Sequence, residues 1–202
     1  GKVGGTELSY DSDLDLVFLH NSTPNKSTTG QDGKGKRAQD NGVFYTRMGQ
    51  RLIHIMNTVT QAGQLYEIDM RLRPSGASGM IVASVSGFKK YQSTEAWTWE
   101  HQALIRARVT CGQTRLAGQY SQIRAEILSK EQNPTDLQQE VREMRYKMRD
   151  NLGSQSVGKA EYQLKQDAGG IVDIEFLVQY LVLANSNKHP VLTTWTDNVR
   201  IL

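Results

Sequence analysis

The sequence predicts an α+β fold that is followed by a helical unit. Two short stretches, residues 13–20 and 65–72, alternate between apolar and polar residues as half-buried strands do. Residues 43–59 instead repeat their apolar residues at helical spacing, and helical patterns dominate the chain after residue 85. Strands are therefore expected in the first half of the chain and helices mainly in the second.

The composition is that of an ordinary globular protein. With 202 residues the chain is long enough for one large domain or two small ones, and a net charge of +3 is too small to indicate a particular ligand. Cys111 is the only cysteine, which excludes an internal disulfide and a cysteine-based zinc site and is typical of a reducing cytoplasm.

The ends and the hydropathy of the chain add further expectations. No apolar run approaches the ~18 residues of a membrane span, and no secretion leader is visible. Gly1 stands in a loop and the final "NVRIL" in mid-helix. We therefore expect a piece of a longer, cytoplasmic protein that binds neither membranes nor nucleic acid.

The first elements follow in order from their patterns. In the strand predicted at residues 13–20, Leu14, Leu16 and Phe18 share one face and Asp13, Asp15 and Val17 the other. Residues 21–41 are polar and glycine-rich, which predicts a long loop. An amphipathic helix is predicted next from the spacing of Phe44, Met48, Leu52, Ile55, Met56 and Val59.

The second strand, "LYEIDMRL" at residues 65–72, places Glu67, Asp69 and Arg71 on its polar face. "RPSGASGM" then predicts a turn, and residues 80–85 predict a further strand.

The remaining elements are helical. Residues 88–109 predict one or two helices, and "NPTDLQQ" predicts a helix start with Thr135 as the N-cap and Gln138 three residues later. The apolar stripe of that helix ends at Gly153, and residues 171–183 predict a buried helix that is apolar nearly all round. The expected domains are residues 1–112 and 113–202.

The acidic stretch around Asp13 has four interpretations. An EF-hand fails because Leu16 occupies the glycine position of the calcium loop. A P-loop at "GQDGKGK" is disfavoured because Arg37 replaces the required Ser or Thr and no apolar strand leads into the loop. A polar turn with solvated aspartates would explain a lone D-x-D, and a metal site is the fourth interpretation.

The metal interpretation uses more of the sequence than the others. Asp13 and Asp15 lie two apart on a strand, so their carboxylates project from the same face. If the second strand pairs beside the first, Asp69 joins them. Carboxylate oxygens are the ligands that Mg²⁺ prefers, with substrate phosphates completing its coordination. Gly4 and Gly5 would let the backbone approach a phosphate, so the pattern predicts a metal-dependent nucleotidyl-transfer site.

The motifs also carry a resemblance. "VGG", seven residues, then "DLDL" resembles the hG[GS]…Dh[DE]h signature of the DNA polymerase β-like nucleotidyltransferases. "GKVGGTELSYDSDLDLVFLH", "YEIDMRLRPSGASGM", "YQSTEAWTWEHQALIRARV" and "GGIVDIEFLVQYLVL" together resemble the glutamine synthetase (glutamate–ammonia ligase) adenylyltransferases. The resemblance implies a DNA polymerase β-like nucleotidyltransferase fold followed by a helical bundle domain.

The resemblance also implies a function. Members of this family join two nucleotidyltransferase halves, one transferring AMP from ATP to a tyrosine of glutamine synthetase and the other removing it by phosphorolysis. "EAWTWEHQALIRARV" is similar to the transferring half. The implied partners are glutamine synthetase, the PII signal protein and the sister half. The removing half and a non-catalytic module that binds nucleotide or PII remain as alternatives.

Site residues follow from the same resemblance. Asp13, Asp15 and Asp69 would bind Mg²⁺, with Asp69 also helping to activate the tyrosine hydroxyl. The residues implied to bind ATP are Gly4, Gly5, Ser12, Arg71 and Arg73. Whether Glu67 is a further ligand stays open.

Other polar and aromatic residues are expected to be structural. Trp97, Trp99 and His101 are expected to pack and orient helices. Asp173 and Glu175 interrupt an apolar helix, which predicts an ion pair or a domain contact, and the basic residues of 142–149 predict a solvated face.

Overall fold

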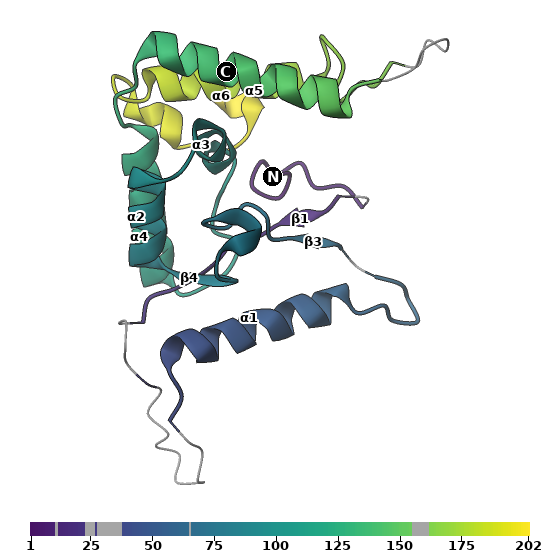
Figure 1. Ribbon diagram of the computed structural model, residues 1–202, viewed down its shortest axis with the longest axis vertical. Helices are drawn as coiled ribbons and strands as arrows, with labels where there is room; N and C mark the ends of the chain where they lie inside the picture. Colours follow the sequence, from purple (N-terminus) through teal and green to yellow (C-terminus); the bar gives the residue numbers. More distant parts are fainter. Residues whose placement is uncertain (11, 23–26, 28–37, 65, 155–161) are drawn as a thin grey trace. The chain divides into compact units, whose positions relative to one another are not determined.

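The computed structural model describes residues 1–10, 12–22, 27, 38–64, 66–154 and 162–202 (Figure 1). Asp11, which the sequence predicts as a turn residue, and most of the predicted loop 21–41 lie outside the described residues. The chain divides into two compact units. Unit 1 contains Gly1–Val3, Glu7–Ala96 and Val109–Tyr120, and unit 2 contains Gly4–Thr6, Trp97–Arg108 and Ser121–Leu202.

Unit 1 holds all the described strands, in two parallel pairs. β1 (Leu14–Asp15) pairs with β3 (Ile68–Asp69), and β2 (Phe18–His20) pairs with β4 (Val82–Ser84). The prediction of one strand over 13–20 is therefore wrong, because its two parts hydrogen-bond to different partners. The predicted strands at 65–72 and 80–85 are present but shorter.

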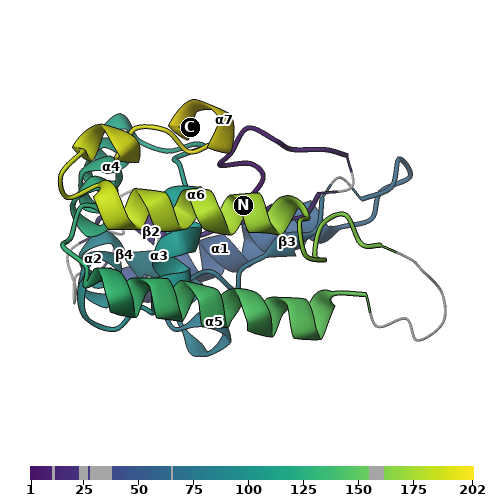
Figure 2. The same cartoon turned by 90° about the horizontal axis from the view of Figure 1, so that it is seen from above.

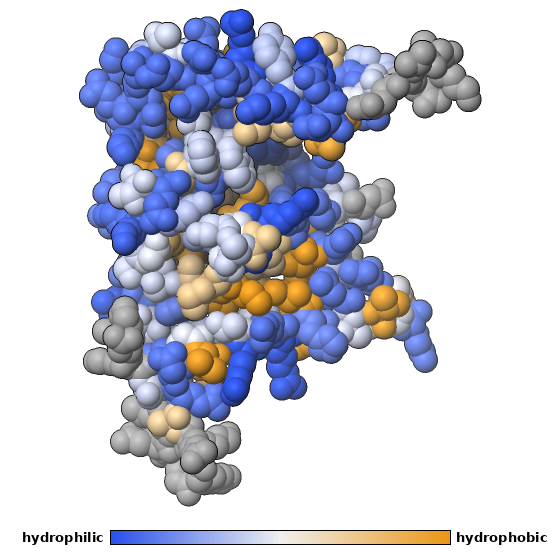
Figure 3. Space-filling model, viewed as in Figure 1, coloured by the Kyte–Doolittle hydropathy of each residue, from blue (hydrophilic) through white to orange (hydrophobic). Residues whose placement is uncertain are grey.

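The predicted amphipathic helix is confirmed as α1 (Asn41–Asn57). It begins where the Asp40 carboxylate accepts a hydrogen bond from the Val43 N–H at 3.1 Å. Gly49 is its buried residue, and a Cβ there would lie 2.7 Å from a Val82 methyl, so a larger residue would push the helix off β4. The apolar stripe that predicted the helix, Phe44, Met48, Leu52 and Ile55, is instead exposed, as Figure 3 shows over α1.

α2 (Val85–Thr94) completes the core of unit 1. The Ser84 hydroxyl accepts a hydrogen bond from the Gly87 N–H at 3.0 Å, which caps the helix directly after β4. Val85 and Phe88 on this helix are buried, as is Val82 on β4. The predicted turn before β4 is also present and includes the short 3-10 helix η1 (Gly76–Ser78).

Unit 2 is helical. α5 (Pro134–Leu152) and α6 (Ile171–Asn185) lie side by side, and α3 (Thr98–Ile105) contacts both (Figure 2). The unit also contains η2 (Pro190–Thr193) and α7 (Asn198–Ile201). A further helix, α4 (Thr114–Leu128), begins in unit 1 and ends in unit 2, and the sequence pattern did not predict it. The most deeply buried side chains of unit 2 are Ile105, Leu128, Val178, Val182 and Ser186.

A buried arginine ties the end of α3 to the C-terminal segment. The Arg124 guanidinium donates to the carbonyls of Leu104 and Ile105 at 3.0 and 2.5 Å and to that of Thr193 at 2.5 Å. Carbonyls at a helix C-terminus have no partner within the helix. Arg124 therefore satisfies the end of α3 and offsets the burial of its own charge.

Three expectations for the helical unit need correction. The N-cap of α5 is Asn133, not Thr135, because Pro134 has no N–H and fits the first helical turn, where none is needed. α6 is not buried all round, since Ile171, Ile174, Leu177 and Leu181 are exposed. Arg145 does not lie on a solvated face: it is buried, and its ion pair with Asp173 on α6 offsets the cost of burying its charge. The predicted helix end at Gly153 is confirmed.

Candidate metal centre

Three carboxylates of unit 1 converge where β1 and β3 pair. Asp15 and Asp69 are direct partners in the parallel register, and Asp13 stands two residues before Asp15 on the same side of the chain. Backbone hydrogen bonds from Leu14 N–H to Glu67 O (2.8 Å) and from Leu16 N–H to Asp69 O (2.9 Å) fix this register. Each aspartate offers an oxygen, and the three oxygens lie within 4.8 Å of one another.

The charges of the cluster are unequally balanced. Burial raises the pKa of Asp15, and repulsion by Asp13 and Asp69 raises that pKa further. The pKa of Asp69 is lowered, mainly by its hydrogen bond with Arg71. An ionised Asp15 is therefore costly in the protein alone, and a nearby cation would lower that cost.

Arg71 and Arg73 make very different contacts. Arg71 is exposed, and its guanidinium donates two hydrogen bonds to Asp69 Oδ2, at 2.7 Å from Nε and 2.5 Å from Nη2. The Arg73 guanidinium donates to the carbonyls of Met70, Ala77 and Gly79 at 2.8–3.1 Å. Arg73 thus holds the turn after β3 closed, while Arg71 can exchange its partner at little cost.

The residues predicted to bind phosphate lie in both units. Ser12, in unit 1, is buried, and its hydroxyl is hydrogen-bonded to the Ser9 hydroxyl at 2.8 Å and to the Ser9 N–H at 3.1 Å. This contact closes the turn that leads into β1. Gly4 and Gly5 are buried in unit 2 against Arg106, where a Cβ on Gly4 would fall 1.7 Å from the Arg106 carbonyl oxygen.

The other residues singled out from the sequence fall outside the carboxylate cluster. Glu67 is exposed and is not part of the acidic group found among the described residues. Trp97 is 70% exposed at the start of α3, so the expectation that it packs between helices is wrong. Trp99 and His101 are partly buried on α3.

The prediction that Asp173 and Glu175 form ion pairs is confirmed. Asp173 pairs with Arg145 at 2.5 Å and Glu175 with Arg106. The pKa of Asp173 is lowered, first by the hydrogen bond that its carboxylate accepts from the Gly169 N–H. Sequence reasoning missed both arginines. Arg106 stands among apolar residues in "ALIRARV", which is the signal of a paired buried charge, whereas Arg145 stands among charged residues and has no such local signal.

The donor set of the cluster fits Mg²⁺. Magnesium takes hard oxygen ligands, is held by few carboxylates, and keeps positions for water and phosphate. Asp13, Asp15 and Asp69 provide only such oxygens, and no His or Cys that would favour zinc belongs to the group in the described part of the chain.

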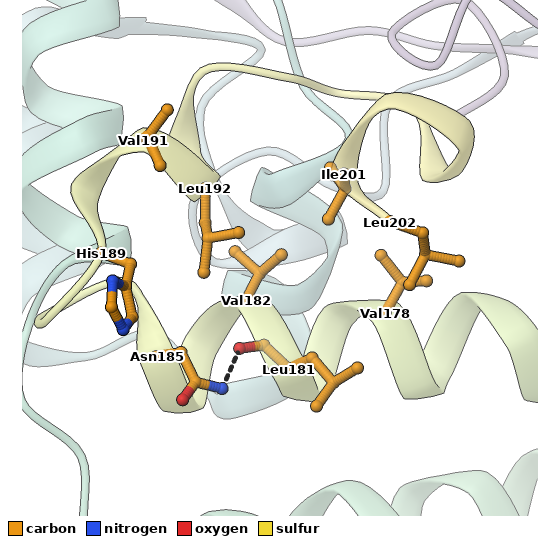
Figure 4. Close-up of a pocket in the computed structure, with 9 residues that line it drawn as sticks. All are labelled: Val178, Leu181, Val182, Asn185, His189, Val191, Leu192, Ile201 and Leu202. Atoms are coloured by element: carbon orange, nitrogen blue, oxygen red, sulfur yellow. Dashed lines mark hydrogen bonds between the residues drawn. The ribbon is translucent and has the colours of Figure 1, made fainter.

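A separate pocket of about 450 Å³ lies in unit 2 (Figure 4). Aliphatic side chains of α6, η2 and α7 line most of it, among them Val178, Val182 and Leu192. Its polar residues are Asn185, whose amide donates to the Leu181 carbonyl at 2.8 Å, and His189. With no carboxylate and no arginine in its lining, this pocket does not suit a nucleotide.

None of the described helices combines the length and the apolar character needed to cross a membrane.

Comparisons with known proteins agree with the motifs. The family described as Glutamate-ammonia ligase adenylyltransferase matches residues 1–123. A bifunctional glutamine synthetase adenylyltransferase/adenylyl-removing enzyme of Shewanella loihica is 55% identical over 201 residues, and its counterpart in Pseudomonas syringae pv. tomato is 52% identical over 212 residues. These matches cover 100% of this chain but 21% of each relative, so the chain spans about a fifth of their length. The chain belongs to the glutamate–ammonia ligase adenylyltransferase family.

Proposed function

We propose that this chain catalyses Mg²⁺-dependent transfer of AMP from ATP to a tyrosine hydroxyl of glutamine synthetase. The observation that carries the proposal is the convergence of Asp13, Asp15 and Asp69, with three oxygens within 4.8 Å, at the paired ends of β1 and β3. Membership of the family and the names of the relatives support the choice of substrate. We further propose that unit 1 has a DNA polymerase β-like nucleotidyltransferase fold.

In the proposed reaction the tyrosine oxygen attacks the α-phosphorus of ATP. The bond from the α-phosphorus to its bridging oxygen breaks, pyrophosphate leaves, and the tyrosine proton passes to a base. Bound Mg²⁺ would supply positive charge for the phosphate oxygens and the leaving group. The protein contributes mainly position and electrostatic stabilisation.

The residues divide these tasks in the proposal. Asp13, Asp15 and Asp69 hold the metal, and Asp69 also orients the tyrosine hydroxyl. Its lowered pKa suits a ligand better than a strong base. Arg71, which is exposed, neutralises charge on the phosphate, while Arg73 keeps the turn after β3 in shape. Gly4 and Gly5 approach the phosphates with their backbone.

A second candidate function is removal of AMP, because the relatives are named as both adenylyltransferases and adenylyl-removing enzymes. In that reaction phosphate attacks the same phosphorus, and ADP and free tyrosine are formed. The same carboxylates would hold the metal, so geometry alone does not separate the two directions. We favour transfer because "EAWTWEHQALIRARV" resembles the transferring half.

Intact mass spectrometry tests the proposal. Unmodified glutamine synthetase is incubated with this chain, Mg²⁺ and ATP, in parallel with Asp13→Asn and with the surface control Glu131→Gln. We expect one AMP per modified subunit with the native chain and the control, and none with Asp13→Asn. Loss of the AMP group from adenylylated partner with formation of ADP in the presence of phosphate, without transfer from ATP, would support the removing reaction instead. Equal transfer by Asp13→Asn would disprove the metal role.

The proposed regulators are tested in the same assay. We propose that the PII signal protein and the sister half act on this activity in the longer protein. Adding PII to the reaction should change the rate of transfer. An unchanged rate with the longest available form of the protein would contradict this part of the proposal.

A further inference from the structure

The Gly4–Thr6 segment rests on one arginine of unit 2. Arg106 follows α3, and its carbonyl oxygen would lie 1.7 Å from a Cβ on Gly4. Its guanidinium would lie 2.4 Å from a Cβ on Gly5. Main chain and side chain of the same residue therefore form the support on which both glycines lie, and neither position has room for a larger residue.

Glu175 on α6 fixes that arginine in place. The Arg106 guanidinium donates to Glu175 Oε1, and the Arg106 side chain is only 6% exposed. One turn earlier on α3 and one turn later on α6, Gln102 donates to Gln179 at 3.0 Å, so two polar contacts join these two segments. Because a buried guanidinium without its carboxylate is costly, the position of Arg106 depends on Glu175.

A third contact holds the other side of the segment. The Thr196 hydroxyl, which is buried, donates to the Gly4 carbonyl at 2.7 Å. Thr6 has a left-handed backbone with φ of 57°, and its own hydroxyl donates to the Gly5 carbonyl at 2.7 Å. The backbone is thus fixed by its carbonyls and by steric contact.

The backbone N–H groups of this segment are available. Within the described part of the chain, the N–H groups of Gly4, Gly5 and Thr6 donate no hydrogen bond. Gly4 and Gly5 are nevertheless buried, where an N–H without an acceptor is unfavourable. Successive N–H groups beside a left-handed residue form a concavity that accepts an anion, and a phosphate is such an acceptor.

We infer that the Arg106–Glu175 pair and Thr196 are positioning residues that hold the N–H groups of the Gly4–Thr6 segment ready for the phosphates of ATP. The inference rests on the proposed function, in which Gly4 and Gly5 approach those phosphates. Arg106 and Glu175 act through the glycines and do not touch the substrate. This positioning role accounts for the presence of the acidic residue Glu175 in a mostly apolar helix.

Calorimetric titration with Mg²⁺·ATP tests this inference, with Glu175→Gln as the variant and Asp173→Asn as the matched control. Both changes remove the charge of an acidic residue on α6 that pairs with an arginine, but only Glu175 acts on the Gly4–Thr6 segment. We expect Glu175→Gln to weaken ATP binding about tenfold or more, and Asp173→Asn to change it less than about twofold. Titration with Mg²⁺ alone should give the same affinity for both variants, because the three aspartates are intact.

Thr196→Val provides a second variant in case Glu175→Gln fails to fold. It removes the hydrogen bond to the Gly4 carbonyl without removing a charge, and we expect it to weaken ATP binding about three- to tenfold. Equal weakening by Glu175→Gln and Asp173→Asn, or unchanged binding in both Glu175→Gln and Thr196→Val, would overturn the inference. If the native chain itself binds no Mg²⁺·ATP, the proposed function fails first and the inference falls with it.

Discussion

At the scale of single residues, Asp15 and Asp69 differ in how the negative charge of the carboxylate is balanced by neighbouring groups. Asp69 is neutralised by Arg71, whereas Asp15 is partly buried between two further carboxylates, so its ionised form is disfavoured without a cation. In the proposed metal site, this arrangement lowers the stability of the protein alone and favours binding of a cation.

Replacing Asp15 with Asn tests this trade. The raised pKa of Asp15 means that its ionised form destabilises the fold at neutral pH, so Asp15→Asn should raise the free energy of unfolding in the absence of metal. Adding Mg²⁺ should stabilise the native chain and leave the variant unchanged. Urea unfolding with and without MgCl₂ measures both effects. A variant that is less stable than the native chain in the absence of metal would contradict the electrostatic account.

The two arginines after β3 provide a matched pair. Arg73→Lys loses the fork that binds three carbonyls of the turn and should lower the free energy of unfolding by about 1–3 kcal/mol. Arg71→Lys should have little effect on stability, because this side chain is exposed. Urea unfolding of both variants measures the difference. Equal losses would show that the contacts of Arg73 are not what holds the turn.

At the scale of elements, helix N-cap hydrogen bonds and aromatic stacking hold short helices and strands in place. β2 holds its neighbour α1 in this way: His20 stacks on Tyr45 with ring centroids 4.6 Å apart. The His20 Nδ1 accepts a hydrogen bond from the Ser22 N–H at 3.2 Å, which requires this nitrogen to be unprotonated. The contact between strand and helix therefore favours neutral histidine.

Stability should accordingly fall on mild acidification. Burial lowers the pKa of His20 in the folded protein, while the unfolded chain keeps a value near 6.5. Below pH 6.5 the unfolded state binds the proton more readily, so the free energy of unfolding falls until the pH passes the folded pKa. We expect a loss of stability between pH 7 and 5 that is absent in His20→Asn. Urea unfolding across this range measures it, and identical pH profiles would refute the assignment.

The start of α5 gives a test of helix capping. Asn133→Ala should cost about 1 kcal/mol, because the Asn133 side chain accepts the hydrogen bond from the Thr135 N–H at 3.0 Å. Thr135→Ala should be nearly neutral, since this residue lies inside the helix. Thermal or urea unfolding of the two variants compares them directly, and a larger loss for Thr135→Ala would restore the N-cap predicted from the sequence.

For the whole molecule, the sequence was informative where the signal is local and weak where it depends on distant contacts. The D-x-D spacing of Asp13 and Asp15 predicts a shared face, and the alternation around Asp69 predicts the strand that pairs with it. The change of strand partner between β1 and β2 has no local signature, so one long strand was predicted. Arg124 and Arg145 likewise gain their partners from segments far along the chain.

In the candidate site, too, the sequence did not reveal the contacts that each side chain makes in the folded protein. The family resemblance implied that Arg71 and Arg73 both bind ATP. β3 ends at Asp69, however, so Arg73 turns back onto its own loop. Gly4 and Gly5 were predicted from a motif, but their support by Arg106 and Thr196 depends on contacts that only the folded unit 2 creates.

The central claim, that Asp13, Asp15 and Asp69 form a divalent metal centre, is tested most directly by titrating the chain with Mn²⁺ and following free Mn²⁺ by electron paramagnetic resonance. Mn²⁺ prefers the same oxygen ligands as Mg²⁺. The account predicts saturable binding that Mg²⁺ displaces and that Asp13→Asn, Asp15→Asn and Asp69→Asn each weaken at least about tenfold, while Glu131→Gln leaves it unchanged. Binding that is equally strong in all three aspartate variants would contradict it.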